Sequence, residues 1–104
     1  MKRQGFKMYL KPGNEVEYER RHREIWPELQ TLLREAGVRN YSIFLDRETG
    51  TLFAYQEIEG SSGSQELGGT EIVRRWWAYM ADLMETNPDL SPVTVPLEDV
   101  FFMP

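Results

Sequence analysis

The stretch from Asn40 to Glu59, NYSIFLDRETGTLFAYQEIE, decides the fold of this chain. It contains two segments, Asn40–Asp46 and Thr51–Glu59, that are rich in the β-branched and aromatic residues typical of strands. Between them, Arg47–Gly50 has the composition of a tight turn with glycine at a left-handed position. The stretch therefore predicts an antiparallel β-hairpin in the middle of the chain.

A strand and a helical segment precede the hairpin. Phe6, Met8 and Leu10 occupy alternate positions, as residues on one face of a strand do. From Glu15 to Ala36, apolar residues recur every three or four positions, which predicts a helix. Pro27 lacks an N–H group and clashes with the carbonyl four residues before it, so we expect a kink or two abutting helices near this residue.

A second helix and a last strand are predicted after the hairpin. The segment Gly60–Gly69 is rich in glycine and serine, and we expect it to be the most mobile part of the chain. A helix is predicted to begin at Thr70 and to carry a broad apolar face as far as Met84. Leu97–Met103 is predicted to form the final apolar strand. The order β-α-β-β-α-β is the ferredoxin-like arrangement, an α+β fold with both helices on one face of a four-stranded antiparallel sheet.

The other face of that sheet is expected to be apolar as well. The strands and the end of the chain hold more aromatic residues than one helix-covered face accommodates; these are Tyr9, Phe44, Tyr55, Phe101 and Phe102. A sheet with two apolar faces needs a second cover. We therefore expect another copy of the chain to provide it in a two-fold homodimer.

Composition narrows the possible functions. The 104 residues suit a single domain spanning 1–104, and the absence of cysteine excludes disulfides, thiolate metal sites and cysteine nucleophiles. One histidine excludes multi-histidine metal sites within a subunit, and a net charge of −5 argues against nucleic-acid or anionic-membrane partners. No signal peptide, membrane span, phosphate-binding loop or dinucleotide fingerprint is recognisable, so we expect a cytoplasmic protein that needs no cofactor.

His22 is the first candidate for chemistry because it is the only imidazole. It lies on the apolar face of the first helical segment, one turn after Tyr18, and its ordinary pKa suits proton transfer near neutral pH. The alternative interpretation is a partly buried histidine that is satisfied by one hydrogen bond.

Aromatic residues form the second candidate group. Adjacent positions on a helix point about 100° apart, so one of Trp76 and Trp77 is predicted to pack inside while the other lines a rim. Aromatic rings with an N–H or O–H group suit sugars, and Tyr18 and Tyr41 lie on elements that are expected to touch. The alternative interpretation of all four residues is that they belong to the core.

Three motifs together resemble the L-rhamnose mutarotase family: RRHREIWPEL at 20–29, RWWAYM at 75–80 and NPDLSPV at 87–93. The resemblance covers essentially the whole chain apart from roughly residues 60–69. It implies a dimeric α+β barrel that interconverts the α and β anomers of L-rhamnose, with His22 as proton donor. It also implies that the sugar is contacted by Tyr18, Tyr41, Trp76 and Trp77.

The chain departs from the family pattern at Gly60–Gly69, where members usually have a more ordered helical lead-in with an aromatic residue. Two alternatives to the mutarotase interpretation stay open: a non-catalytic sugar-sensing module and a small cofactor-free oxygenase with the same barrel. The second group needed for proton transfer is also open; a tyrosine, a carboxylate or a held water would serve.

Overall fold

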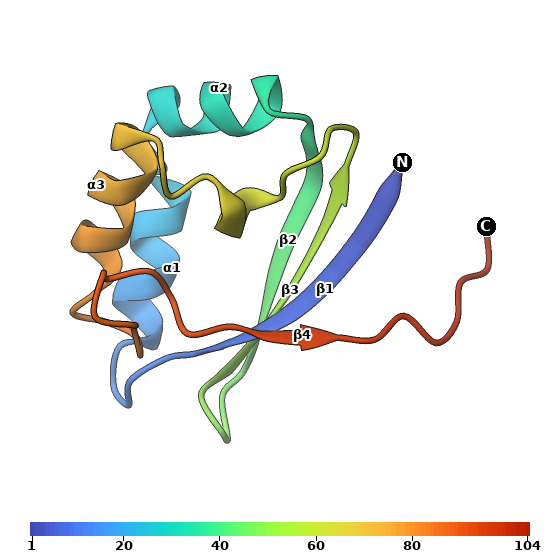
Figure 1. Ribbon diagram of the computed structural model, residues 1–104. Helices are drawn as coiled ribbons and strands as arrows, with labels where there is room; N and C mark the ends of the chain where they lie inside the picture. Colours follow the sequence, from blue (N-terminus) through green and yellow to red (C-terminus); the bar gives the residue numbers. More distant parts are fainter.

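A four-stranded antiparallel sheet carries all the helices on one of its faces (Figure 1). The computed structural model describes residues 1–104. The sheet has the strand order β2-β3-β1-β4, which confirms the ferredoxin-like arrangement. The elements in chain order are β1 (Lys2–Tyr9), α1 (Glu15–Arg23), α2 (Pro27–Glu35), β2 (Val38–Asp46), β3 (Thr51–Ile58), a short 3₁₀ helix (Ser64–Glu66), α3 (Glu71–Met80) and β4 (Val95–Leu97).

The first helical segment is divided at the expected proline. Helix α1 ends at Arg23, and α2 begins with Pro27 in its first turn. Proline favours this position because the missing N–H has no partner there, and it keeps the preceding Trp26 extended. The prediction of two abutting helices is therefore confirmed.

The central hairpin contains a β-bulge that decides which side chains face the helices. Gly50 closes the turn with a φ of 76°, but the pairing shifts between Arg39 and Ser42, where β2 has one extra residue. Asn40 adopts a left-handed φ of 48° and donates a hydrogen bond from Nδ2 to Oε1 of Glu57 at 2.9 Å. The extra residue reverses the alternation of the strand, as bulges do. As a result, Tyr41 packs against the core.

The core fills the space between the sheet and the helices. Strands β1 and β3 supply one side and the helices the other, while Leu83 and Met84 join the core from the turns that follow α3. The buried apolar cluster consists of Phe6, Met8, Leu10, Tyr18, Leu29, Leu52, Ala54, Val73, Trp76, Trp77, Met80, Leu83 and Met84.

The prediction of a final strand over Leu97–Met103 is wrong. Strand β4 is limited to Val95–Leu97, which pairs with β1, and the following residues leave the sheet and run away from the helices (Figure 1). An apolar run forms a strand only where a partner edge and a surface to cover are available, and this tail finds almost none within its own chain. The exposed apolar side chains of the tail are Val100, Phe101, Phe102 and Met103.

The face of the sheet away from the helices is partly apolar, as expected. Phe44 and Phe53 are directly opposite each other on β2 and β3, and Phe44 is 67% exposed. The tail adjoins this sheet through Arg3 of β1, which forms an ion pair with Asp99 and lies over the ring of Phe102. The chain therefore presents apolar surface that its own helices do not cover.

The segment Gly60–Gly69 contains more structure than its composition suggests. Ser64 is buried, and its backbone N–H donates to Oε1 of Gln56 at 3.1 Å. Gln56 is itself fully buried and donates to Oε1 of Gln4 at 2.6 Å. The middle of the segment is thus attached to the sheet, and the mobility of Gly60–Gly69 stays a prediction.

Candidate active site

One cavity brings together all five residues that the sequence proposed for a site. It has a volume of about 940 Å³ and lies between the helices and β2. Tyr18 and His22 come from α1, Trp76 and Trp77 from α3, and Tyr41 from β2. Residues that are far apart in the sequence meet here because the helices pack on the same face of the sheet.

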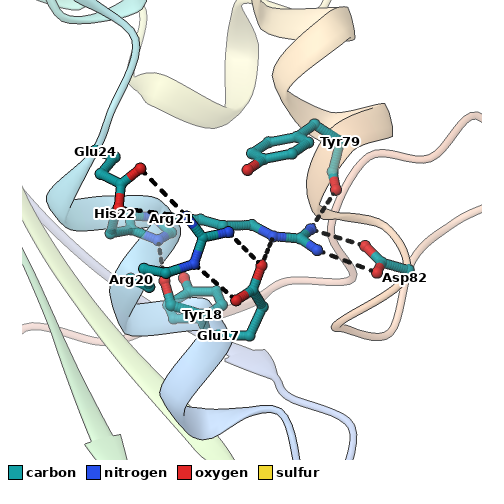
Figure 2. Close-up of polar contacts among 8 residues, drawn as sticks. All are labelled: Glu17, Tyr18, Arg20, Arg21, His22, Glu24, Tyr79 and Asp82. Carbon is teal, nitrogen blue, oxygen red and sulfur yellow. Dashed lines mark hydrogen bonds and ion pairs between the residues drawn. The ribbon is translucent and has the colours of Figure 1, made fainter.

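His22 has one hydrogen bond, and this bond determines which ring nitrogen is free. Nδ1 lies 3.2 Å from the backbone carbonyl of Tyr18 (Figure 2). A carbonyl oxygen can only accept, so Nδ1 carries the hydrogen and Nε2 of the neutral ring keeps its lone pair. Burial lowers the pKa of His22 below 6.5, although the bond to Tyr18 opposes this shift. At neutral pH the side chain is therefore a proton acceptor through Nε2.

Two aromatic rings hold the imidazole in place. The ring of Tyr18 lies 4.4 Å from that of His22, and Trp76 meets the imidazole edge-on with the centroids 5.4 Å apart. Trp76 is supported in turn by Trp26 at 5.1 Å and Tyr79 at 5.6 Å. Packing against these two rings restricts the rotation of the imidazole ring.

The two tyrosines in the cavity keep their hydroxyl protons at neutral pH. Burial raises the pKa of Tyr18, and the proximity of Tyr41 adds to this effect. Burial also raises the pKa of Tyr41, while the side chains of Ser64 and Gln65 partly oppose the rise. These hydroxyls are therefore suited to donate hydrogen bonds to a polar ligand rather than to act as bases.

The two tryptophans are buried equally, so the expected division into an inside and a rim residue is wrong. Trp76 and Trp77 are both 8% exposed, and both line the cavity. The glycine-rich segment covers Trp77, and a Cβ atom on Gly68 would lie only 2.8 Å from its ring. Part of the Trp77 ring is thus covered by the glycine-rich segment.

Sequence reasoning missed two groups of residues near the site. Ser64 and Gln65 line the cavity beside Tyr41, but the glycine and serine composition of their segment predicts mobility and no local pattern indicates a role in the site. Trp26 and Tyr79 support Trp76. Trp26 lies four residues after His22, and this helical spacing indicates that Trp26 could lie near the same site.

The arrangement favours proton transfer on a small polar molecule with apolar faces. A free imidazole nitrogen, two neutral phenol groups and two indole rings share one cavity. No group of three or more His, Cys, Asp or Glu side chains lies close enough together to hold a metal ion. None of the helices has the length and apolar character needed to cross a membrane.

Comparison with known proteins identifies the family. The L-rhamnose mutarotase family profile matches residues 3–103. The chain is 64% identical to an L-rhamnose mutarotase of Bacteroides thetaiotaomicron and 57% identical to one of Phocaeicola vulgatus, in both cases over 99% of each chain. The crystal structure of an L-rhamnose mutarotase from Formosa agariphila superposes with a TM-score of 0.94 at 50% identity over the whole of both chains. A protein from Mycobacterium tuberculosis, Rv0793, shares the fold with a TM-score of 0.57 at 15% identity. The chain belongs to the L-rhamnose mutarotase family.

Proposed function

We propose that this chain interconverts the α and β anomers of L-rhamnose, with His22 taking the proton of the anomeric hydroxyl when the ring opens and acting as proton donor when the ring closes. The observation that carries the proposal is the state of His22, whose Nδ1 is bonded to Tyr18 and whose neutral ring leaves Nε2 free beside the cavity. Family membership supports the choice of sugar.

The reaction requires two coupled proton transfers. Nε2 of His22 accepts the proton of the anomeric hydroxyl while the bond between C1 and the ring oxygen breaks, which leaves an aldehyde at C1. The ring oxygen takes up a proton from a second group, for which the Tyr18 or Tyr41 hydroxyl or a water held by them is available. After rotation about the C1–C2 bond, the same steps run in reverse on the other face, and His22 returns its proton to the carbonyl oxygen. Each positioned acid or base contributes about 10²–10⁴-fold.

The other cavity residues are proposed to bind the sugar. Tyr18 and Tyr41 donate hydrogen bonds to its hydroxyls, and Trp76 and Trp77 cover its C–H faces and its methyl group. This leaves C1 free to rotate while the rest of the molecule is held. No cofactor is needed in this scheme.

Saturation-transfer NMR on the equilibrium mixture of L-rhamnose anomers tests the proposal. The protein should accelerate exchange between the two anomeric proton signals above the buffer rate, and His22→Ala should lose about 10²-fold or more of that acceleration. L-mannose, which differs by a hydroxyl in place of a hydrogen at C6, serves as the control sugar. Binding of L-rhamnose without faster exchange would favour a sugar sensor, and absence of both would remove the sugar assignment.

We also propose that two copies form a homodimer through the face of the sheet away from the helices. Phe44, Phe53 and the apolar tail after Leu97 support this, because each chain leaves them without a cover. Light scattering at micromolar concentration should give about twice the 12.2 kDa of one chain, and Phe44→Ser should shift the mass toward one chain. A wild-type mass of 12.2 kDa would contradict the proposal.

A further inference from the structure

Arg21 precedes His22 on α1 and extends toward Tyr79 and Asp82 at the end of α3 (Figure 2). Its side chain is only 12% exposed. Nη1 donates to the backbone carbonyl of Tyr79 at 2.6 Å and to Oδ1 of Asp82 at 2.9 Å. Nη2 donates to Oδ2 of Asp82 at 3.3 Å, and Nε donates to Oε2 of Glu17 at 2.8 Å.

These bonds connect two helices at a place where backbone groups need partners. The carbonyls in the last turn of a helix have no intrahelical donor, and Tyr79 lies in the last turn of α3. A cationic side chain at this position satisfies the carbonyl and the negative end of the helix dipole. The Arg21 guanidinium also lies 4.5 Å from the centre of the Tyr79 ring, which packs on Trp76.

Apart from the ring contact of His22 with Trp76, few side-chain contacts fix helix α1 against α3. It has nine residues, and only Tyr18 among them is buried. The hydrogen bond of His22 stays within α1, and so do the ion pairs that Arg23 and Glu17 form there, whereas Arg21 makes side-chain hydrogen bonds from α1 to α3 and to the turn after it. A helix this short is not stable alone, and its position depends on such tertiary contacts.

We propose that Arg21 is a positioning residue for His22, because it docks α1 on the end of α3 and so holds the imidazole against Trp76. This inference rests on the proposed function of His22. Arg21 itself does not line the cavity and takes no part in the proton transfers.

The test compares Arg21→Met with Arg75→Met. Methionine keeps most of the length of the Arg21 side chain and removes every hydrogen bond. Arg75 is the matched control because it is 66% exposed, pairs only with Glu71 of its own helix and lies outside the cavity. Misplacement of a reacting group by about 1 Å can cost about 10²-fold, so we expect kcat of folded Arg21→Met to fall about tenfold or more. Its KM should change less than its kcat, since Tyr18 is the only proposed sugar-binding residue on α1 and Tyr41, Trp76 and Trp77 lie on other elements, and Arg75→Met should stay within about twofold of wild type in both constants.

NMR of the single histidine distinguishes the two possible roles of Arg21, because a purely structural role would leave the His22 signals unchanged. Every imidazole signal belongs to His22, and the neighbouring rings of Tyr18 and Trp76 shift these signals strongly. Folded Arg21→Met should move the His22 signals away from their wild-type positions, and Arg75→Met should not. Wild-type His22 signals, or a kcat equal to that of Arg75→Met, would overturn the inference.

A second variant decides the matter if Arg21→Met does not fold. Asp82→Ala removes the carboxylate beyond α3 and leaves Arg21 in place, so we expect a smaller effect in the same direction, about threefold in kcat, together with shifted His22 signals. Unchanged values of both would contradict the inference. His22→Ala is measured in parallel: if it keeps the wild-type rate, the proposed function fails, whereas loss of rate in His22→Ala with full kcat in Arg21→Met removes only the role of Arg21.

Discussion

Replacing Trp76 and Trp77 by leucine, one at a time, should separate two residues that are adjacent on one helix and equally buried. Both are 8% exposed, so the same substitution removes nearly the same apolar area from each. That loss is about 60–80 Å², or about 2 kcal/mol, at 25 cal/mol per Å². The burial contribution is therefore expected to cancel between the two variants.

The difference comes from the aromatic contacts of Trp76. Its ring pairs with His22, Trp26 and Tyr79 at centroid distances of 5.4, 5.1 and 5.6 Å, whereas Trp77 has no such pair. Aromatic pairs contribute about 0.5–1.5 kcal/mol each beyond area, although neighbouring contributions do not add fully. We expect Trp76→Leu to lose about 1–3 kcal/mol more unfolding free energy than Trp77→Leu.

Urea unfolding followed by far-UV circular dichroism measures this difference without depending on tryptophan fluorescence. Trp76→Phe is the control, since it keeps an aromatic ring and should recover part of the loss. In exchange NMR, Trp76→Leu should lower the anomerisation rate because His22 loses its packing partner, while Trp77→Leu should mainly weaken sugar binding. Equal free energies of unfolding for the two leucine variants would refute the reasoning from aromatic pairs.

Four further predictions concern the pH dependence of the rate, the pH dependence of stability, packing and chain mobility. Because His22 accepts a proton only when neutral, the exchange rate should fall as pH drops through a pKa below 6.5 and level off above it; a rate that increases toward acid would contradict the acceptor role. Because the pKa of His22 is lower in the folded than in the unfolded protein, the stability that the neutral side chain contributes is fully present above about pH 6.5. This stability is lost as pH falls through the pKa of His22 in the folded protein, and His22→Ala should not show this loss. Glu17, whose pKa is held near 2 by hydrogen bonds from Arg20 and Arg21, does not titrate in that range. Gly68→Ala should cost about 1–3 kcal/mol in urea unfolding because its Cβ meets the Trp77 ring, whereas Gly69→Ala, with open space around its Cβ, should be nearly neutral. Limited proteolysis should cut within 60–69 before it cuts α1, α2 or α3; a first cut inside a helix would contradict this.

The helix boundaries and the hairpin turn could be predicted from the sequence because each of these signals depends on only a few residues. Pro27 divides the first helical segment, Gly50 closes the hairpin and Thr70 precedes the second apolar helix, as predicted. The prediction of a strand over Leu97–Met103 is wrong because apolar residues indicate that a segment needs burial but do not indicate which surface buries it. In the single chain most of this run has no such partner.

The candidate site was predicted in part. Tyr18 and His22 are one helical turn apart, so their common face follows from helix geometry. That Tyr41 joins them depends on the bulge at Asn40, which reverses the alternation of β2 and is fastened by Glu57 of the neighbouring strand. A register shift of one residue turns every later side chain to the opposite face of the sheet, and the sequence of the strand contains no pattern that predicts such a shift.

By itself the sequence determined the order of the elements, the division at Pro27, the single imidazole and the motifs of the family. Only the tertiary structure decided that Trp77 is covered by the glycine-rich segment and that Arg21 links α1 to the end of α3. The physical reason is the range of the interactions. Helix periodicity, turns and caps are set by neighbours within about four residues, whereas the cover of a side chain and the partner of a buried guanidinium come from segments dozens of residues away.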